Sequence, residues 1–215
     1  HWLAEDDAYR AYLSDGNHTW GSNRTRAHPG LMYLDTVRLG LDPANDAAYR
    51  AAGIGYLHYL HGVNPTGFAY LTNMAAFGFE RSGSQIYHAW FADGSDWDET
   101  GVSLYGPAPG FVPGGPNPSF APDPSYSGPP LEPPQAQPVQ KSYRDWNAGW
   151  PENSWEVTEN SITYQSAYVR LLSALAPPVG SAALPASPGN SLRAVRAVGD
   201  VDLSWPPAAR ATSYD

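Results

Sequence analysis

A group of acidic and aromatic residues around position 155 has the residue types needed for proton transfer on a ring-shaped ligand. Glu159 follows Trp155 by four residues and precedes Tyr164 by five, and Asp145 and His88 are further polar candidates. A positioned Glu, Asp or His can transfer a proton to a reacting group. Aromatic rings stack on the apolar C–H faces of ligands such as pyranoses. The alternative for Glu159 is a carboxylate in a first helical turn, which stabilises the helix dipole by about 0.3 to 1 kcal/mol.

The composition suits an uncharged, ring-containing ligand. Aromatic residues make up 13% of the 215 residues, whereas charged residues are only 15%, although core packing is the commoner use of aromatic rings. The net charge of −9 and the scattered twelve Lys and Arg residues argue against nucleic acid. Because no long apolar run occurs, we expect no membrane-spanning helix and no membrane partner. The absence of cysteine excludes a disulfide framework and a thiolate metal site.

Three helical segments and a long irregular segment should carry these side chains. Residues 29–63 have apolar residues at helical spacing, with a second helix from Asp46 that Asn64-Pro65 stops. Between Thr66 and Trp155 the pattern dissolves, and its proline-dense part, Pro113–Pro138, is interpreted as a solvated surface excursion. Residues 155–175 predict one further helix with Glu159 in its first turn. The predicted buried stripe of that helix is Ile162, Val169, Leu172 and Leu175.

The C-terminal part of the chain differs in composition from the rest. Residues 177–188 form a Pro/Ala/Ser linker, and residues 189–215 alternate apolar and polar side chains about a turn, as two short strands would. This pattern, with Trp205 after an alternating stretch, resembles the start of a fibronectin type III domain. Two strands cannot bury a core alone, so we expect a short, truncated and weakly ordered β segment. Since the sequence lacks an initiating Met and its last residues stop within an alternating pattern, we expect a fragment at both ends.

The acidic and aromatic residues also resemble the acid-bearing signature of glycoside hydrolase family 9. That signature is an aromatic residue, any residue and Asp, followed later by an aromatic residue, three residues, the catalytic Glu and a small residue two positions on. Departures are a longer gap after Asp145 and Gln165 in place of the customary Asn. The matching segments are Tyr143-Arg144-Asp145 and 155–161. Segments similar to others of the family are Trp20-Gly21-Ser22-Asn23, the helix end 59–65, Tyr70-Leu71-Thr72, which resembles a strand of the family, and Gly114-Gly115-Pro116-Asn117.

The resemblance implies a fold and an activity. Residues 1–176 would be the C-terminal portion of an all-α (α/α)6 barrel with long irregular loops. The activity would be inverting hydrolysis of β-1,4 bonds in cellulose or related β-glucans, by a secreted bacterial cellulase of the endo-β-1,4-glucanase type. The family's base lies in an Asp-Ala-Gly-Asp motif that this sequence lacks, so the base is expected upstream and these residues alone are expected to be inactive. Glu159 would be the catalytic acid, and the substrate would be bound by His88, Trp20, Tyr164, Trp155 and Asp145.

Two other functions stay open. The family's His signature continues with Arg two residues later, where this chain has Trp90, so that Arg81 or Trp90 is at best a substitute. This change favours an exo-acting hydrolase of chitosan-type or other β-linked oligosaccharides. The alternative of another class is a non-catalytic carbohydrate-binding module. We expect a monomer with no cofactor, since a solvated turn is favoured over a Ca²⁺ site for the acidic residues, which are Asp93, Asp96, Asp98 and Glu99.

Overall fold

The computed structural model describes residues 7–88, 93–176, 193–197 and 200–204. The chain divides into two compact units, His1–Leu175 and Ala176–Asp215. In the second unit, β3 (Arg193–Ala197) and β4 (Asp200–Ser204) form an antiparallel pair with Ala197 opposite Asp200. The predicted linker 177–188, Trp205 and the rest of the fibronectin-like segment lie outside the described residues.

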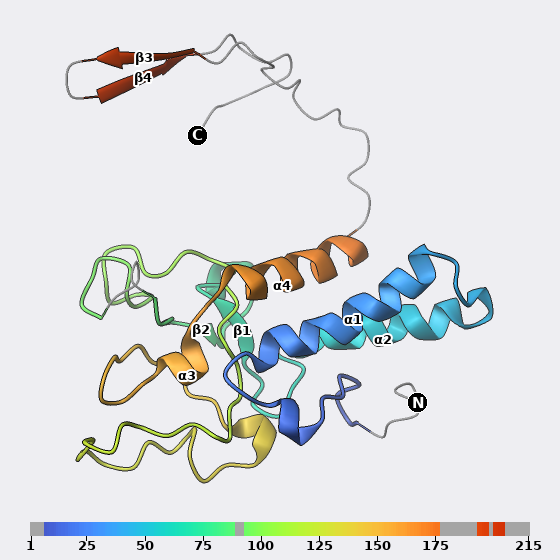
Figure 1. The fold of residues 1–215 in the computed structure, drawn as a ribbon, viewed down its shortest axis with the longest axis horizontal. Helices are drawn as coiled ribbons and strands as arrows, with labels where there is room; N and C mark the ends of the chain where they lie inside the picture. Colours follow the sequence, from blue (N-terminus) through green and yellow to red (C-terminus); the bar gives the residue numbers. More distant parts are fainter. Residues whose placement is uncertain (1–6, 89–92, 177–192, 198–199, 205–215) are drawn as a thin grey trace. The chain divides into compact units, whose positions relative to one another are not determined.

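Three helices of the first unit pack together around its main core (Figure 1). α1 (Ser22–Arg38) and α2 (Asp46–Leu60) lie side by side, joined through the short 3₁₀ turn Pro43–Asn45. α4 (Ile162–Leu175) packs against both of them. The two helices predicted within residues 29–63 are therefore present, although the first begins earlier, at Ser22.

Two glycines allow α1, α2 and α4 to approach closely. A Cβ added at Gly30 would lie 2.8 Å from Tyr56 Cβ, and one added at Gly53 would lie 2.7 Å from Leu34 Cγ. Both distances are shorter than real carbon contacts, so any side chain there would push the helices apart. The same packing explains why α1 continues through Pro29, since tertiary contacts rather than local propensity stabilise most helices.

A small parallel sheet follows α2. β1 (Ala69–Thr72) pairs with β2 (Ser82–Gly83), with Ala69 opposite Ser82 and Thr72 opposite Gly83. The strand predicted at residues 70–72 is thus confirmed, and the all-α class is incomplete. All four residues of β1 are buried, so the strand lacks the apolar and polar alternation that would have distinguished it clearly from a helical turn.

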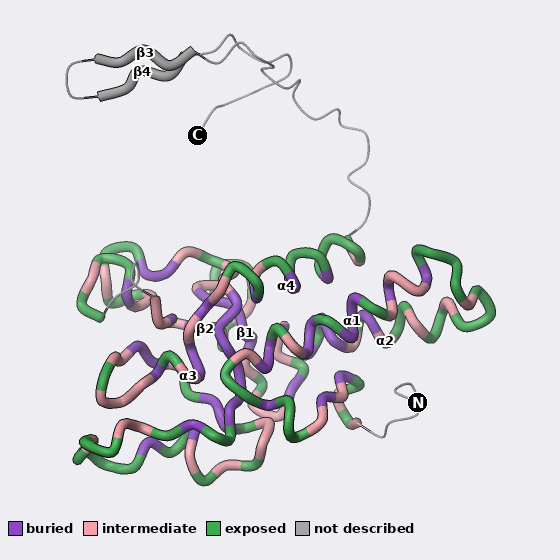
Figure 2. Tube along the Cα trace, in the orientation of Figure 1, coloured by how far each residue is buried: buried purple, intermediate pink, exposed green. Residues whose placement is uncertain are grey.

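The irregular segment between β2 and α3 (Trp155–Thr158) supplies part of the core. Phe120 and Leu131 are buried in the main cluster, and residues 112–117 are buried without interruption (Figure 2). The interpretation of Pro113–Pro138 as a solvated excursion is therefore wrong for residues 113–117, Phe120 and Leu131, whereas many of the other residues in this stretch are exposed. Its prolines and glycines prevent regular structure, but its apolar side chains still fill the space beside the helices.

The single helix predicted over residues 155–175 is broken. α3 ends at Thr158, Glu159 has extended backbone angles (φ −60°, ψ 139°), and α4 begins at Ile162. The predicted stripe is also wrong, since Ile162 is 88% exposed. The buried face includes two tyrosines, whose rings pack as apolar groups although their hydroxyls are polar. The buried residues of α4 are Tyr164, Ala167, Tyr168 and Leu171, at the helical spacing of three and four.

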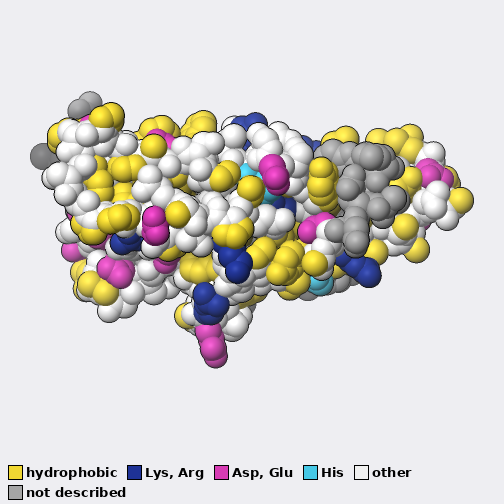
Figure 3. All heavy atoms as spheres, turned by 90° about the horizontal axis from the view of Figure 1, so that it is seen from below, with side chains coloured by type: hydrophobic (Ala, Val, Ile, Leu, Met, Phe, Trp, Pro, Cys, Tyr) yellow, Lys and Arg dark blue, Asp and Glu magenta, His cyan; other side chains and the backbone are white. Residues whose placement is uncertain are grey.

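The surface has dispersed charges. On the face drawn in Figure 3, acidic and basic side chains lie among apolar and uncharged ones, and no stripe of Lys and Arg crosses that face. None of the helices in the described part of the chain has the length and apolar character required to cross a membrane.

Candidate active site

Glu159 lies in the break between α3 and α4. Its extended backbone makes it the C-terminal cap of α3, so it is not in the first turn of a helix as predicted. Because the C-terminal end of a helix carries partial negative charge, the dipole of α3 does not stabilise a carboxylate here. Trp20 Nε1 donates a hydrogen bond to Glu159 Oε2 at 3.0 Å, across 139 residues of sequence. Among the described residues, none donates a hydrogen bond to the other carboxylate oxygen, Oε1.

Trp20, which binds this carboxylate, belongs to a cluster of two exposed indole rings and one buried phenol. Trp20 contacts Trp155 edge to face at 6.5 Å between ring centroids, and contacts Tyr164 at 6.1 Å. Trp20 and Trp155 are 45% and 37% exposed, whereas Tyr164 is 2% exposed. Burial, with a smaller contribution from the Glu159 charge, raises the pKa of Tyr164 to about 12. The two indoles can therefore contact a ligand directly, and the ring of Tyr164 supports Trp20 from inside.

The motif Trp20-Gly21-Ser22-Asn23 is held against the Gly114-Gly115 turn. Asn23 N donates to Gly114 O at 2.9 Å, and Asn23 Nδ2 donates to Pro113 O at 3.1 Å. A Cβ added at Gly21 would lie 2.8 Å from the hydroxyl oxygen of Tyr164. A side chain at this position would therefore displace the Tyr164 ring, which packs against the backbone beside Trp20.

The same turn holds α3. Gly115 N donates to Val157 O at 2.9 Å, and Asn117 Nδ2 donates to Glu156 O at 3.1 Å. Gly114 is packed so closely that an added Cβ would lie 2.8 Å from Val157 O. Two sequence motifs about ninety residues apart thus interlock, and their contacts position Trp20 and Glu159 relative to each other.

Gln165, the departure from the family signature, has a structural role. Its Nε2 donates to Val112 O and its Oε1 accepts from Val112 N, both at 3.1 Å. The paired bonds fasten α4 to the segment that leads into the Gly114 turn. The longer side chain of Gln165 therefore links α4 to the backbone of Val112.

The residue before His88 is hydrogen-bonded to the residue before Glu159. Tyr87 N donates to Thr158 O at 3.3 Å, which ties the His88 segment to the last residue of α3. His88 is half-buried. Trp90, one candidate substitute for the family's Arg, lies outside the described residues.

Asp145 belongs to a second cluster. Its Oδ2 accepts from Ser84 N at 2.8 Å and from Ser84 Oγ at 2.9 Å, and its Oδ1 accepts from Gln85 N at 3.3 Å. Burial raises the pKa of Asp145, although these hydrogen bonds act in the opposite direction. Asp145 thereby holds the segment that leads to His88.

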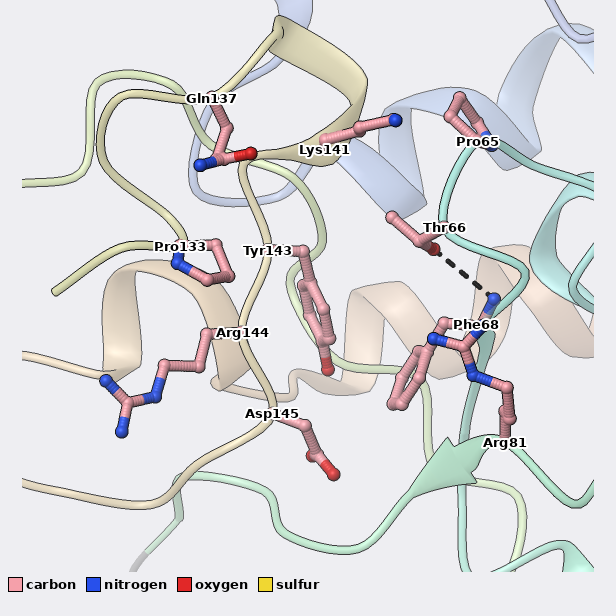
Figure 4. Close-up of a pocket in the computed structure, with 10 residues that line it drawn as sticks. All are labelled: Pro65, Thr66, Phe68, Arg81, Pro133, Gln137, Lys141, Tyr143, Arg144 and Asp145. Atoms are coloured by element: carbon pink, nitrogen blue, oxygen red, sulfur yellow. Dashed lines mark hydrogen bonds between the residues drawn. The ribbon is translucent and has the colours of Figure 1, made fainter.

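Asp145 and Arg81 also line a surface pocket of about 430 Å³. In Figure 4 the Asp145 carboxylate lies on one side of this pocket, and Lys141 and Gln137 lie on the other. Glu159, Trp20, Trp155 and Tyr164 do not line it. The structure thus gathers three of the predicted residues, Trp20, Trp155 and Tyr164, near Glu159. It joins the His88 segment to α3 through Tyr87 and places Asp145 beside a different pocket.

Gln85, in the segment that leads to His88, makes structural hydrogen bonds that the sequence did not indicate. Its Oε1 accepts from Asn147 N at 3.0 Å, and its Nε2 donates to Glu99 Oε2 at 3.1 Å. Asp98 Oδ1 accepts from Asn147 Nδ2 at 3.0 Å. Within the described residues no group of three His, Cys, Asp or Glu side chains is arranged to hold a metal ion. A lone Gln in an irregular segment carries no periodic signal, which is why only the contacts identify it.

Two comparisons with known proteins find a similarity. A solved structure, described as the crystal structure of a metagenome-derived glycoside hydrolase family 9 endoglucanase, matches with a TM-score of 0.55 and 23% sequence identity. The match covers 80% of this chain and 25% of that one, so the chain spans about a quarter of the endoglucanase. The chain matches no curated protein. The model of glycosyl hydrolase family 9 matches residues 4–172, and the chain belongs to that family.

Proposed function

We propose that this chain is part of an inverting hydrolase of β-1,4-linked glucans, with Glu159 as its general acid. The observation that carries the proposal is the hydrogen bond from Trp20 to Glu159 Oε2 beside a pair of exposed indoles, Trp20 and Trp155, that contact each other. Oε1 accepts no hydrogen bond from the described residues, so it is available to deliver a proton to a leaving glycosidic oxygen. Family membership makes a glycosidic bond the expected target.

The second carboxylate must come from elsewhere in the enzyme. Inversion requires a base that activates water on the opposite face of the sugar, with the two carboxyl groups roughly 6.5 to 9.5 Å apart. Asp7 is the nearest acidic residue to the described N-terminus, but its carboxylate already accepts Ala11 N at 2.7 Å. We therefore assign residues 1–176 to the C-terminal part of an (α/α)6 catalytic barrel, whose remaining part supplies the base.

The other predicted residues differ in how they would act on the sugar. Trp20 and Trp155 present exposed rings that can stack on pyranose C–H faces. His88 would contact the ring beside the scissile bond. Tyr164 and Asp145 are held by protein contacts, so they act by positioning Trp20 and the His88 segment. Because a polysaccharide cannot enter a cell intact, we propose that the enzyme is secreted and acts on its polymer as a monomer.

The test is Glu159→Gln in the full-length enzyme, with Glu156→Gln, on the short helix that Glu159 caps, as the matched control. Loss of a general acid lowers turnover by about 10²- to 10⁴-fold. Reducing-end release from carboxymethylcellulose should fall by that factor in the first variant and stay near wild type in the second. Binding of the polymer should persist in both, because neither change removes an aromatic ring.

Two outcomes would redirect the proposal. Undiminished hydrolysis by the Glu159 variant would exclude the acid role. Faster hydrolysis of chitosan oligosaccharides than of carboxymethylcellulose by the wild-type enzyme would move the substrate to amino sugars while keeping the acid. A polarimetric or NMR measurement of the first product anomer would establish inversion or retention.

A further inference from the structure

An exposed aromatic pair lies outside the cluster around Glu159. The rings of Trp97 and Tyr105 are stacked, with centroids 4.5 Å apart and planes inclined by 29°. Trp97 is 45% exposed and Tyr105 is 57% exposed. One face of each ring covers the other, and the remaining surface is open to solvent. A flat apolar surface of this kind is a ligand-binding feature when the backbone beneath it is rigid.

The turn beneath these rings is closed by hydrogen bonds. Tyr105 N donates to Asp96 O at 2.8 Å, which brings the two ends of the turn together. Ser103 Oγ accepts from Glu99 N at 3.0 Å and from Gly106 N at 3.2 Å. The rings are therefore held in place before a ligand arrives, and less conformational entropy is lost on binding.

The turn is also fastened to the segment that leads to His88. Thr100 N donates to Ser84 O at 2.9 Å, and Glu99 Oε2 accepts from Gln85 Nε2 at 3.1 Å. The same segment reaches Thr158, next to Glu159, through Tyr87 N. One continuous set of hydrogen bonds thus joins the aromatic pair to the candidate active site.

We propose that Trp97 and Tyr105 form a stacking subsite for a hexose ring of the polysaccharide substrate. The inference rests on the proposed function, since it takes the ligand to be a β-linked glycan. Pyranose C–H faces are the apolar surfaces that fit exposed indole and phenol rings. Exposed carboxylates at Asp93 and Asp96 accompany the pair, so an uncharged hexose fits and a uronic acid or sulfated sugar would be repelled.

The experiment uses the full-length enzyme with three single variants. Trp97→Ala removes the larger ring, Trp97→Phe retains an aromatic face, and Leu104→Ala removes a 69% exposed apolar side chain from the same turn. Affinity electrophoresis in hydroxyethylcellulose gels gives the dissociation constant for an uncharged glucan. Steady-state hydrolysis of the same polymer gives KM and kcat separately.

We expect the dissociation constant and KM of Trp97→Ala to rise about tenfold, with kcat unchanged, because the lost contact is equal in the ground and transition states. For Trp97→Phe the dissociation constant and KM should stay within about threefold of the wild-type values, and for Leu104→Ala both should equal the wild-type values. Unchanged affinity in Trp97→Ala, or an equal loss in Leu104→Ala, would overturn the subsite. Glu159→Gln separates the two proposals: persistent turnover in that variant contradicts the acid role, while the gel affinities still decide the subsite.

Discussion

Replacing Gly114 by Ala should disturb the site without changing any side chain that is proposed to contact substrate. A Cβ at this position would lie 2.4 Å from Trp20 O and 2.8 Å from Val157 O. Both atoms belong to the backbone, so neither can rotate away. Ordinary van der Waals contact begins near 3.4 Å, and the Trp20 and Val157 segments must separate by about 1 Å.

The expected losses of stability and of kcat in Gly114→Ala follow from that separation. Overpacking in a close-packed region costs about 1 to 3 kcal/mol of unfolding free energy. The displaced atoms lie next to the hydrogen bond between Trp20 and Glu159, which measures 3.0 Å, so a shift of 1 Å would break its geometry. Misplacing a catalytic group by about 1 Å can cost about a hundredfold in rate. We therefore expect kcat to fall further than the loss of stability alone would explain.

The assay compares Gly114→Ala with Gly149→Ala in the full-length enzyme. A Cβ at Gly149 would meet no heavy atom within 4 Å, so this control adds the same methyl group in open space. Urea unfolding measures stability, and initial rates on carboxymethylcellulose below the unfolding transition measure kcat. Wild-type kcat and stability in Gly114→Ala would refute the idea that this turn fixes Trp20 against Glu159.

Two further predictions concern buried polar groups. Burial and, secondarily, the Arg26 charge lower the pKa of His18 from 6.5 to about 4, while Arg26 Nη2 lies 2.7 Å from His18 Nε2. The neutral ring therefore stabilises the fold above pH 6.5, and this contribution is lost as pH falls through 4. The urea midpoint of unfolding, measured from pH 7 to 4, should fall less in His18→Gln than in the wild type. Parallel curves for the two proteins would contradict this. Asp145→Asn places an amide N–H₂ against the N–H donors of Ser84 and Gln85, which should cost about 1 to 3 kcal/mol and lower kcat by moving the His88 segment. Urea unfolding and steady-state kinetics measure both effects, and an unchanged kcat would exclude the positioning role of Asp145.

Local patterns in the sequence determined the parts of the fold that depend on near neighbours. The helical spacing within residues 29–63 predicted α1 and α2, because residues three and four apart share one face of a helix. The triplet at residues 70–72 predicted part of β1. The order of short motifs also identified the family before any contact was known.

Only the tertiary structure decided how those motifs meet. The helix break at Glu159, the burial of Tyr164 and the core contribution of residues 112–117 depend on partners distant in sequence. Asp145 has a residue type suited to sugar binding, yet its oxygens accept hydrogen bonds from Ser84 and Gln85, about sixty residues away. Periodicity reports which face of an element is apolar, whereas the partner of a polar group is set by the path of the whole chain. For this reason the sequence singled out Glu159 as the candidate acid, whereas packing determined which residues its carboxylate contacts.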